Sequence, residues 1–205
     1  MTFLNDSLRD FSDALASKAA TPGGGGASAL VGALGAALGT MVGNLTVGKK
    51  KYADVEADIL KLMEETEALR NELMSLIDED AVAFEPLSKA YSIPKDDPTR
   101  DETMERCLKG AAEVPMRILR ACCKVIELQN GFAEKGSSLA VSDAGCGVVF
   151  CKAAMQGAAL NVLINTGSMK DRAFADAMNE EVKSLLEKYG KAADEVYERV
   201  YGGLV

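Results

Sequence analysis

The segment that most constrains the fold runs from Pro22 to Tyr52 and places four consecutive glycines ahead of a long apolar stretch. Glycines after a proline let the backbone turn tightly, and the following residues predict a helix over 27–46. At about 100° per residue, large side chains gather on one face of this helix and small ones on the opposite face. The leucine face comprises Leu30, Leu34, Leu38, Met41 and Leu45, and the glycine face comprises Ser28, Gly32, Gly35, Ala36, Gly39 and Gly43.

The glycine face needs a close neighbour, because a glycine inside a helix costs about 1 kcal/mol relative to alanine. A second helix nested against the small residues is one explanation. A substrate that binds where the helix begins is the other, and the two are compatible. The second explanation predicts substrate contacts from Pro22, Gly23, Gly24, Gly25 and Ser28.

The rest of the chain predicts more helices and shows no alternating pattern of a β-strand. Apolar residues recur at spacings of three and four over 4–15, 55–84, 104–125 and 143–165, and a charged amphipathic tail covers 171–201. Pro86 and the segment 94–98 indicate a loop, Pro115 a kink or break, and Gly190 a break in the tail. We therefore expect an all-α protein in which long antiparallel helices form one domain, residues 1–205, around a buried glycine-rich helix.

Charge and composition narrow the class of protein. The net charge of -8 argues against a nucleic-acid partner, which requires a basic surface. Five cysteines without paired C-x-x-C spacings, and no histidine, argue against a metal site and are typical of small buried side chains in a reducing cytoplasm. No basic segment precedes an apolar run at the start, so we expect no signal peptide. The stretch 27–46 is long enough to span a membrane but only weakly hydrophobic, which favours a cytoplasmic protein without a membrane partner.

Asp80 occupies an unusual position in the apolar pattern of its helix. The series Val55, Ile59, Leu73 and Leu76 leads to it at helical spacing, so a leucine is expected there. A carboxylate in an apolar seam is costly unless it is paired or protonated, and burial raises its pKa into a range useful for proton transfer. A hydrogen-bonded structural role at the end of the seam is the alternative, and we favour function.

A second carboxylate begins the helix predicted from about Ser142 to Asn165. Asp143, three small residues, Asn161 and Asn165 share one face of this helix, and apolar residues cover its other sides. We expect the helix to be buried nearly all round. The carboxamides then line either a polar seam between helices or the wall of a polar-ligand site.

Three lysines form a basic spot in this acidic chain, directly after the glycine-rich helix. A lysine run is usually a solvated face, but lysines beside a tyrosine at a helix end also suit an anionic ligand. On the second interpretation we expect substrate contacts from Asn44, Lys49, Lys50 and Tyr52.

Four segments together resemble the cyclodeaminase/cyclohydrolase family. They are PGGGGASALVGALGAALGTMVGNLTVGKKKY (22–52), DEDAVAF (78–84), EVP (113–115) and SDAGCGVVFCKAAMQGAALNVLINT (142–166). The resemblance implies an all-helical homodimer that acts on a one-carbon unit carried by tetrahydrofolate, with no cofactor beyond that substrate. One departure is Gly136-Ser137-Ser138, where the family often has Gly-Asn, so a role for an asparagine there does not carry over.

The residues allow the chemistry that this resemblance implies. Hydrolysis of a cyclic methenyl bridge needs water at an amidinium carbon and a proton at the leaving nitrogen, and ring closure of a formimino group needs loss of ammonia. One or two carboxylates suffice for either reaction, and in a chain without histidine Asp80 and Asp143 are our catalytic candidates for one shared site.

The absence of a transferase domain favours hydrolysis of 5,10-methenyltetrahydrofolate to 10-formyltetrahydrofolate. Three alternatives stay open at this point. They are a 5-formiminotetrahydrofolate cyclodeaminase that releases ammonia, a non-catalytic folate-binding or scaffolding bundle, and a membrane-associated helical protein.

Overall fold

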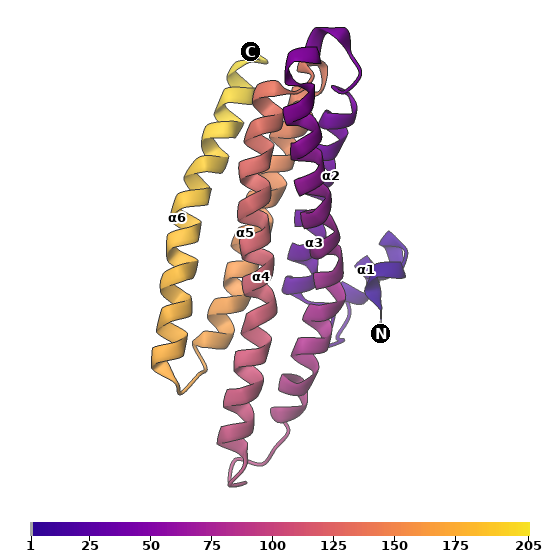
Figure 1. Ribbon diagram of the computed structural model, residues 1–205. Coiled ribbons are helices and arrows are strands. Elements are labelled where there is room, and N and C mark those ends of the chain that lie inside the picture. Colours follow the sequence, from indigo (N-terminus) through magenta and orange to yellow (C-terminus); the bar gives the residue numbers. More distant parts are fainter. Residues whose placement is uncertain (1) are drawn as a thin grey trace.

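The structure, a computed structural model, describes residues 2–205, and every regular element in that range is helical (Figure 1). The all-α prediction is therefore confirmed. In order, the elements are η1 (Phe3–Asn5), α1 (Leu8–Leu15), α2 (Gly24–Asn44), η2 (Lys50–Val55), α3 (Glu56–Ala90), α4 (Arg100–Lys135), η3 (Ser138–Ala140), α5 (Val141–Thr166) and α6 (Arg172–Gly202).

The five long helices lie side by side, and α1 projects from the bundle (Figure 1). Helix α2 packs against α3 and α5, α4 packs against α3 and α5, and α6 covers α4 and α5. Fully buried side chains from four of these helices form the core between them. They include Leu73, Leu76, Ile118, Leu119 and Met155, together with Ala29, Ala33 and Ala36 of α2.

The glycine face of α2 packs against neighbouring helices. A Cβ atom at Gly32 would lie 2.8 Å from Cys122 Sγ, and one at Gly39 would lie 2.8 Å from Gln129 Nε2. Both distances are shorter than real Cβ contacts, so these positions admit no side chain without movement of the neighbour. The prediction of a helix nested against the small residues is confirmed for this middle part of α2.

The glycine-rich helix is not enclosed by the bundle, however, because its leucine face is exposed. Leu34 is 46% exposed, and Met41 and Leu45 are exposed as well. The expectation that α5 is buried nearly all round is also wrong. Its exposed apolar residues include Val149, Phe150, Leu160, Leu163 and Ile164.

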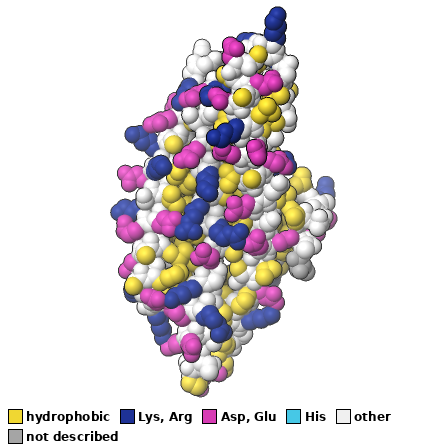
Figure 2. All heavy atoms as spheres, viewed as in Figure 1, with side chains coloured by type: hydrophobic (Ala, Val, Ile, Leu, Met, Phe, Trp, Pro, Cys, Tyr) yellow, Lys and Arg dark blue, Asp and Glu magenta, His cyan; other side chains and the backbone are white. Residues whose placement is uncertain are grey.

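Helices α2 and α5 pack against each other, and we call their exposed apolar side chains together the apolar face. By length and composition alone, Gly24–Asn44 and Ser138–Thr166 are apolar enough to cross a membrane, yet about half of each is buried inside the bundle. The surface over α3, α4 and α6 is different, since acidic and basic side chains are intermingled across it (Figure 2).

The breaks predicted at Pro86 and Gly190 are absent, and at Pro115, where a kink or a break was predicted, there is no break. Helix α3 continues through Pro86 to Ala90, α4 runs through Pro115, and α6 runs through Gly190. Packing explains each case, because Leu87, Pro115 and Tyr189 are buried at these points. Tertiary contacts therefore outweigh the local cost of proline or glycine in a helix. Helix α2 also begins at Gly24 rather than at residue 27, so three of the four glycines are helical.

Candidate active site

A small cavity lies where α2 begins, enclosed by the segment before α2 and by α3, α4 and α5. Its volume is about 160 Å³. It brings together three residues predicted from the sequence on separate segments, namely Asp80, Asn161 and Asn165, and Gly23 also lines it. The other lining residues are Ala20, Thr21, Phe84, Ala111, Pro115 and Ile164. We call this cavity the Asp80 pocket.

Asp80 reaches the pocket because the apolar seam of α3 turns it toward the start of α2. Its Oδ2 atom accepts a hydrogen bond from the backbone N–H of Gly26 at 3.0 Å. Burial raises the pKa of the Asp80 carboxyl above its ordinary value, and the Gly26 hydrogen bond opposes this shift in part. A raised pKa brings the carboxyl closer to the neutral pH at which a group exchanges protons efficiently.

Gly25 allows the start of α2 to approach Asp80. A Cβ atom at this position would overlap all three atoms of the Asp80 carboxylate group. Gly24 lies against Asn161 in a similar way, since a Cβ atom there would be 2.9 Å from Asn161 Nδ2. The first glycines of α2 therefore serve the pocket, whereas the later ones serve helix packing.

The NH₂ groups of the two carboxamides of α5 donate hydrogen bonds within the protein. Asn161 Nδ2 donates to the Gly157 carbonyl at 2.8 Å, and Asn165 Nδ2 donates to the Asn161 carbonyl at 2.8 Å and the Ala111 carbonyl at 3.2 Å. Within residues 2–205, no protein donor occupies either Oδ1 atom. Both oxygens remain free to accept hydrogen bonds from a substrate or a water molecule.

Three other residues predicted near the start of the helix differ in their surroundings. A Cβ atom at Gly23 would meet nothing within 4 Å, so this residue leaves room for a ligand. Ser28 is buried and donates to the Gly24 carbonyl at 2.6 Å, and Pro22 is buried beneath α2. Neither Ser28 nor Pro22 lines the pocket, so their contribution is to the shape of the turn into α2.

The remaining predicted residues lie at the opposite end of α2 and α5. Asn44 ends α2, which spans about 30 Å from its start. Asp143 lies in the first turn of α5, 18 residues or about 27 Å before Asn161. Within one chain, therefore, the two candidate carboxylates do not share a site, contrary to the expectation from the sequence.

We call the residues Lys49, Lys50, Lys51 and Tyr52 at this second end the lysine cluster. Tyr52 is held by Ser138, whose backbone N–H donates to the Tyr52 hydroxyl at 3.0 Å and whose Oγ lies 3.3 Å from it. The contact with the Ser138 hydroxyl, which has the larger effect, and the contact with its N–H lower the pKa of Tyr52 to about 7. Within residues 2–205, none of the three lysines forms an ion pair, so their charges are available to an anion.

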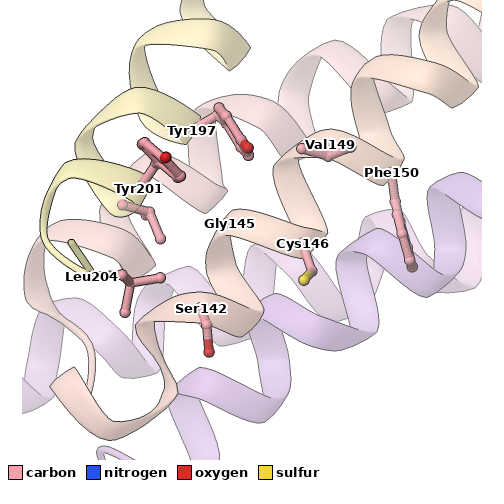
Figure 3. Close-up of a pocket in the computed structure, with 9 residues that line it drawn as sticks. Ser142, Gly145, Cys146, Val149, Phe150, Tyr197, Tyr201 and Leu204 are labelled. Atoms are coloured by element: carbon pink, nitrogen blue, oxygen red, sulfur yellow. The ribbon is translucent and has the colours of Figure 1, made fainter.

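A larger cavity of about 340 Å³ lies between α5 and α6 but contains no carboxylate (Figure 3). Phe150, Tyr197, Tyr201 and Leu204 make it apolar. Cys146, expected to be buried with the other cysteines, is exposed here. Because proton transfer requires a titrating group of suitable pKa, the smaller Asp80 pocket is the better candidate for an active site.

Sequence reasoning missed several residues of the pocket, although two of them had a usable signal. Phe84 lies one turn after Asp80 in the same motif, and Pro115 ends the EVP motif. Ala111 and Ile164 had no such signal, because only the packing of α4 against α5 turns them toward the cavity.

The comparisons with known proteins agree with this architecture. The methenyltetrahydrofolate cyclohydrolase of Methylorubrum extorquens is 44% identical over 96% of both chains. The formimidoyltransferase-cyclodeaminase of Mus musculus is 31% identical over 91% of this chain, which corresponds to 35% of the mouse protein. The crystal structure of formiminotetrahydrofolate cyclodeaminase from Thermotoga maritima superposes with a TM-score of 0.82 at 33% identity, over 96% of this chain and 94% of that one. Residues 7–184 match the formiminotransferase-cyclodeaminase family profile, and the chain belongs to this family of enzymes.

Proposed function

We propose that the protein hydrolyses 5,10-methenyltetrahydrofolate to 10-formyltetrahydrofolate at the Asp80 pocket. The observation that carries this proposal is a buried carboxyl of raised pKa beside two free carboxamide oxygens in one small cavity. The 44% identity to a methenyltetrahydrofolate cyclohydrolase over nearly the whole of both chains supports the choice of substrate.

Asp80 suits this reaction in two ways. The methenyl bridge carries a positive charge, so an ionised Asp80 attracts the reacting carbon and accepts a proton from the attacking water. The oxygen of that water bonds to the bridge carbon, and the carbon–nitrogen bond then breaks as the protonated carboxyl returns its proton to the leaving nitrogen. Loss of the remaining hydroxyl proton to solvent completes the formyl group.

The carboxamides and the start of α2 position the substrate and the water. Oδ1 of Asn161 and Oδ1 of Asn165 accept hydrogen bonds from a water molecule or from N–H groups of the substrate. The backbone N–H groups of Gly24 and Gly25, which have no intrahelical partner, suit the formyl oxygen that forms when the hydroxyl loses its proton, whereas those of Gly26 and Ala27 are already paired. We propose that no metal and no cofactor beyond the folate-bound substrate takes part.

Cyclodeamination of 5-formiminotetrahydrofolate is the second candidate reaction. The fold match to a formiminotetrahydrofolate cyclodeaminase favours it, and the same carboxyl can protonate a departing ammonia. The lower identity to that protein, 33% against 44%, makes it the second choice.

One experiment separates the two reactions. Purified protein is offered each substrate in turn, while the absorbance of the methenyl chromophore and the release of ammonia are followed. We expect rapid loss of methenyl absorbance with the first substrate and no ammonia from the second. Ammonia release at a comparable rate would assign the cyclodeaminase reaction, and no turnover of either substrate would refute an enzymatic role in this pathway.

We also propose that the protein acts as one domain, in a cytoplasmic homodimer without a nucleic-acid or membrane partner. The acidic net charge argues against a nucleic-acid partner, and the exposed apolar face supports the homodimer. Sedimentation equilibrium tests the homodimer, and a monomer at micromolar concentration would contradict it.

A further inference from the structure

We propose that Pro115 is a positioning residue for the reaction, because it leaves the Ala111 carbonyl free to hold the Asn165 carboxamide in one orientation. All three residues line the Asp80 pocket. The inference rests on the proposed function for the reaction that it affects. The contact between α4 and α5 is argued from the structure of the chain alone.

A proline inside a helix removes one backbone hydrogen bond. Its nitrogen carries no proton, so the carbonyl four residues earlier loses its helical donor, and the proline ring pushes against that carbonyl. In α4 the proline is Pro115, and the carbonyl four residues before it belongs to Ala111. Because Ala111 is only 4% exposed, its carbonyl needs another donor in place of the missing one.

Asn165 of α5 supplies the missing donor. Its Nδ2 atom donates one hydrogen bond to the Ala111 carbonyl at 3.2 Å and a second to the Asn161 carbonyl at 2.8 Å. A carboxamide has two N–H groups, so both are in use. Because Asn165 lines the pocket, its Oδ1 atom is the part of the side chain that is left to interact with a ligand there.

The Ala111 carbonyl also decides which way round the Asn165 carboxamide lies. In a flipped carboxamide, Oδ1 would face two carbonyl oxygens, and neither of these has a proton to donate. The flipped side chain would lose both hydrogen bonds and would offer a ligand two donors in place of an acceptor. Asn161 is held by fewer contacts, since within residues 2–205 its Nδ2 atom donates to the Gly157 carbonyl alone.

A fixed acceptor matters for the proposed reaction because the attacking water has two protons. One of them passes to Asp80, and Oδ1 of Asn165, in the same cavity, holds the other. With both protons held, a lone pair of the water oxygen is directed at the bridge carbon. The proline therefore removes a hydrogen bond from α4 and provides a fixed acceptor at the pocket, a loss of stability of the kind that active sites retain.

Pro115→Ala tests the proposal because alanine restores the N–H at residue 115. This N–H should turn the Ala111 carbonyl back along α4 and break its contact with Asn165, which at 3.2 Å is already long for such a bond. We expect kcat for 5,10-methenyltetrahydrofolate to fall about tenfold to a hundredfold, with an unchanged or higher Tm. Pro86→Ala is the matched control, since it restores the same kind of bond in α3 at an exposed proline outside the pocket and should leave kcat unchanged.

A double-mutant cycle shows whether Pro115 acts through Asn165. In an Asn165→Ala background the carboxamide is absent, so Pro115→Ala should cause no further fall in kcat. A fall by the same factor in both backgrounds would overturn the proposal, because Pro115 would then affect the pocket by another route, such as its own ring. Full kcat in the single variant Pro115→Ala would overturn it as well.

Thermal unfolding of the same variants tests the contact without any activity, so it separates a failure of this inference from a failure of the proposed function. Asn165→Ala leaves the Ala111 carbonyl with neither donor, and the further change Pro115→Ala supplies one. Pro115→Ala should therefore raise Tm more in the Asn165→Ala background than in the wild type, whereas Pro86→Ala should change Tm equally in both. Equal changes from Pro115→Ala in the two backgrounds would show that Pro115 and Asn165 are not coupled, and would refute the inference even in a protein that hydrolyses the methenyl substrate.

Discussion

Replacing Asp80 by asparagine should abolish most of the turnover and at the same time stabilise the fold. The substitution keeps the size of the side chain and an oxygen that accepts the Gly26 hydrogen bond, but removes the titrating proton. Proton transfer by a positioned side chain contributes about 100-fold to 10,000-fold in rate, or about 3 to 5 kcal/mol in activation free energy. We therefore expect kcat to fall by about two to four orders of magnitude.

The stability effect has a definite sign because burial raises the pKa of Asp80 above its ordinary value of 3.8. The contribution of the group to folding is most favourable below that ordinary value and is lost as the pH rises through the raised pKa of the folded state. Asparagine carries no charge at any pH. The gain in Tm of Asp80→Asn over the wild type should therefore increase from acidic to neutral pH.

Two measurements check this reasoning together. Steady-state turnover of 5,10-methenyltetrahydrofolate gives kcat, and thermal unfolding at several pH values gives Tm for both proteins. Asp78→Asn is a matched control, since its carboxylate is two residues away but accepts hydrogen bonds from the Phe3 and Leu4 amides outside the pocket. Near-normal kcat in a folded Asp80→Asn variant would exclude Asp80 as the proton-transfer group, and a pH-independent gain in Tm would refute the buried-carboxylate argument.

Three further predictions concern other parts of the chain. Gly39→Leu should overpack the contact with Gln129 and lower the free energy of unfolding by about 1 to 3 kcal/mol. Gly110→Leu is the control, because nothing lies within 4 Å of its Cβ position, and equal melting temperatures of the two variants would contradict the prediction. Lys49→Gln with Lys50→Gln should raise KM more for polyglutamylated than for monoglutamylated substrate, and an equal effect on both would indicate a solvated face. Tyr52 becomes negatively charged as the pH rises through about 7, so in the wild type KM for polyglutamylated substrate should increase at pH values above about 7. In Tyr52→Phe this KM should change less, and identical pH profiles of the two proteins would rule out a role for the charge.

Much of the fold follows from local patterns that a sequence displays directly. Helical spacing of apolar residues located every long helix, and the seam from Val55 to Leu76 identified Asp80 as an inward carboxylate. The interpretation of Pro86 and Gly190 as helix breakers was wrong, because the cost of such a residue is local whereas the compensating burial comes from other helices.

The composition of the pocket was predictable only in part, for a physical reason. Asp80, Asn161 and Asn165 are polar residues among apolar ones, so their own sequence neighbours mark them as exceptional. Ile164 and Ala111 are ordinary apolar residues, and their place at the pocket depends on how α4 and α5 pack. Asp143 had the same local signal as Asp80, but a sequence pattern does not reveal that about 27 Å of helix separates it from Asn161.

The glycines of α2 serve two purposes at different positions along the helix, namely close helix packing and room for a buried carboxylate. At Gly32, Gly35 and Gly39 the missing side chain lets α3, α4 and α5 approach, which is a matter of stability. At Gly25 the missing side chain makes room for a carboxylate whose burial is itself unfavourable, so the substitution Gly25→Ala would disturb Asp80 rather than the core. The packing of α2 at Gly32, Gly35 and Gly39 therefore stabilises the bundle, and the bundle in turn holds the buried Asp80 carboxylate next to Gly25. Such a balance is expected where an active site retains a destabilising group.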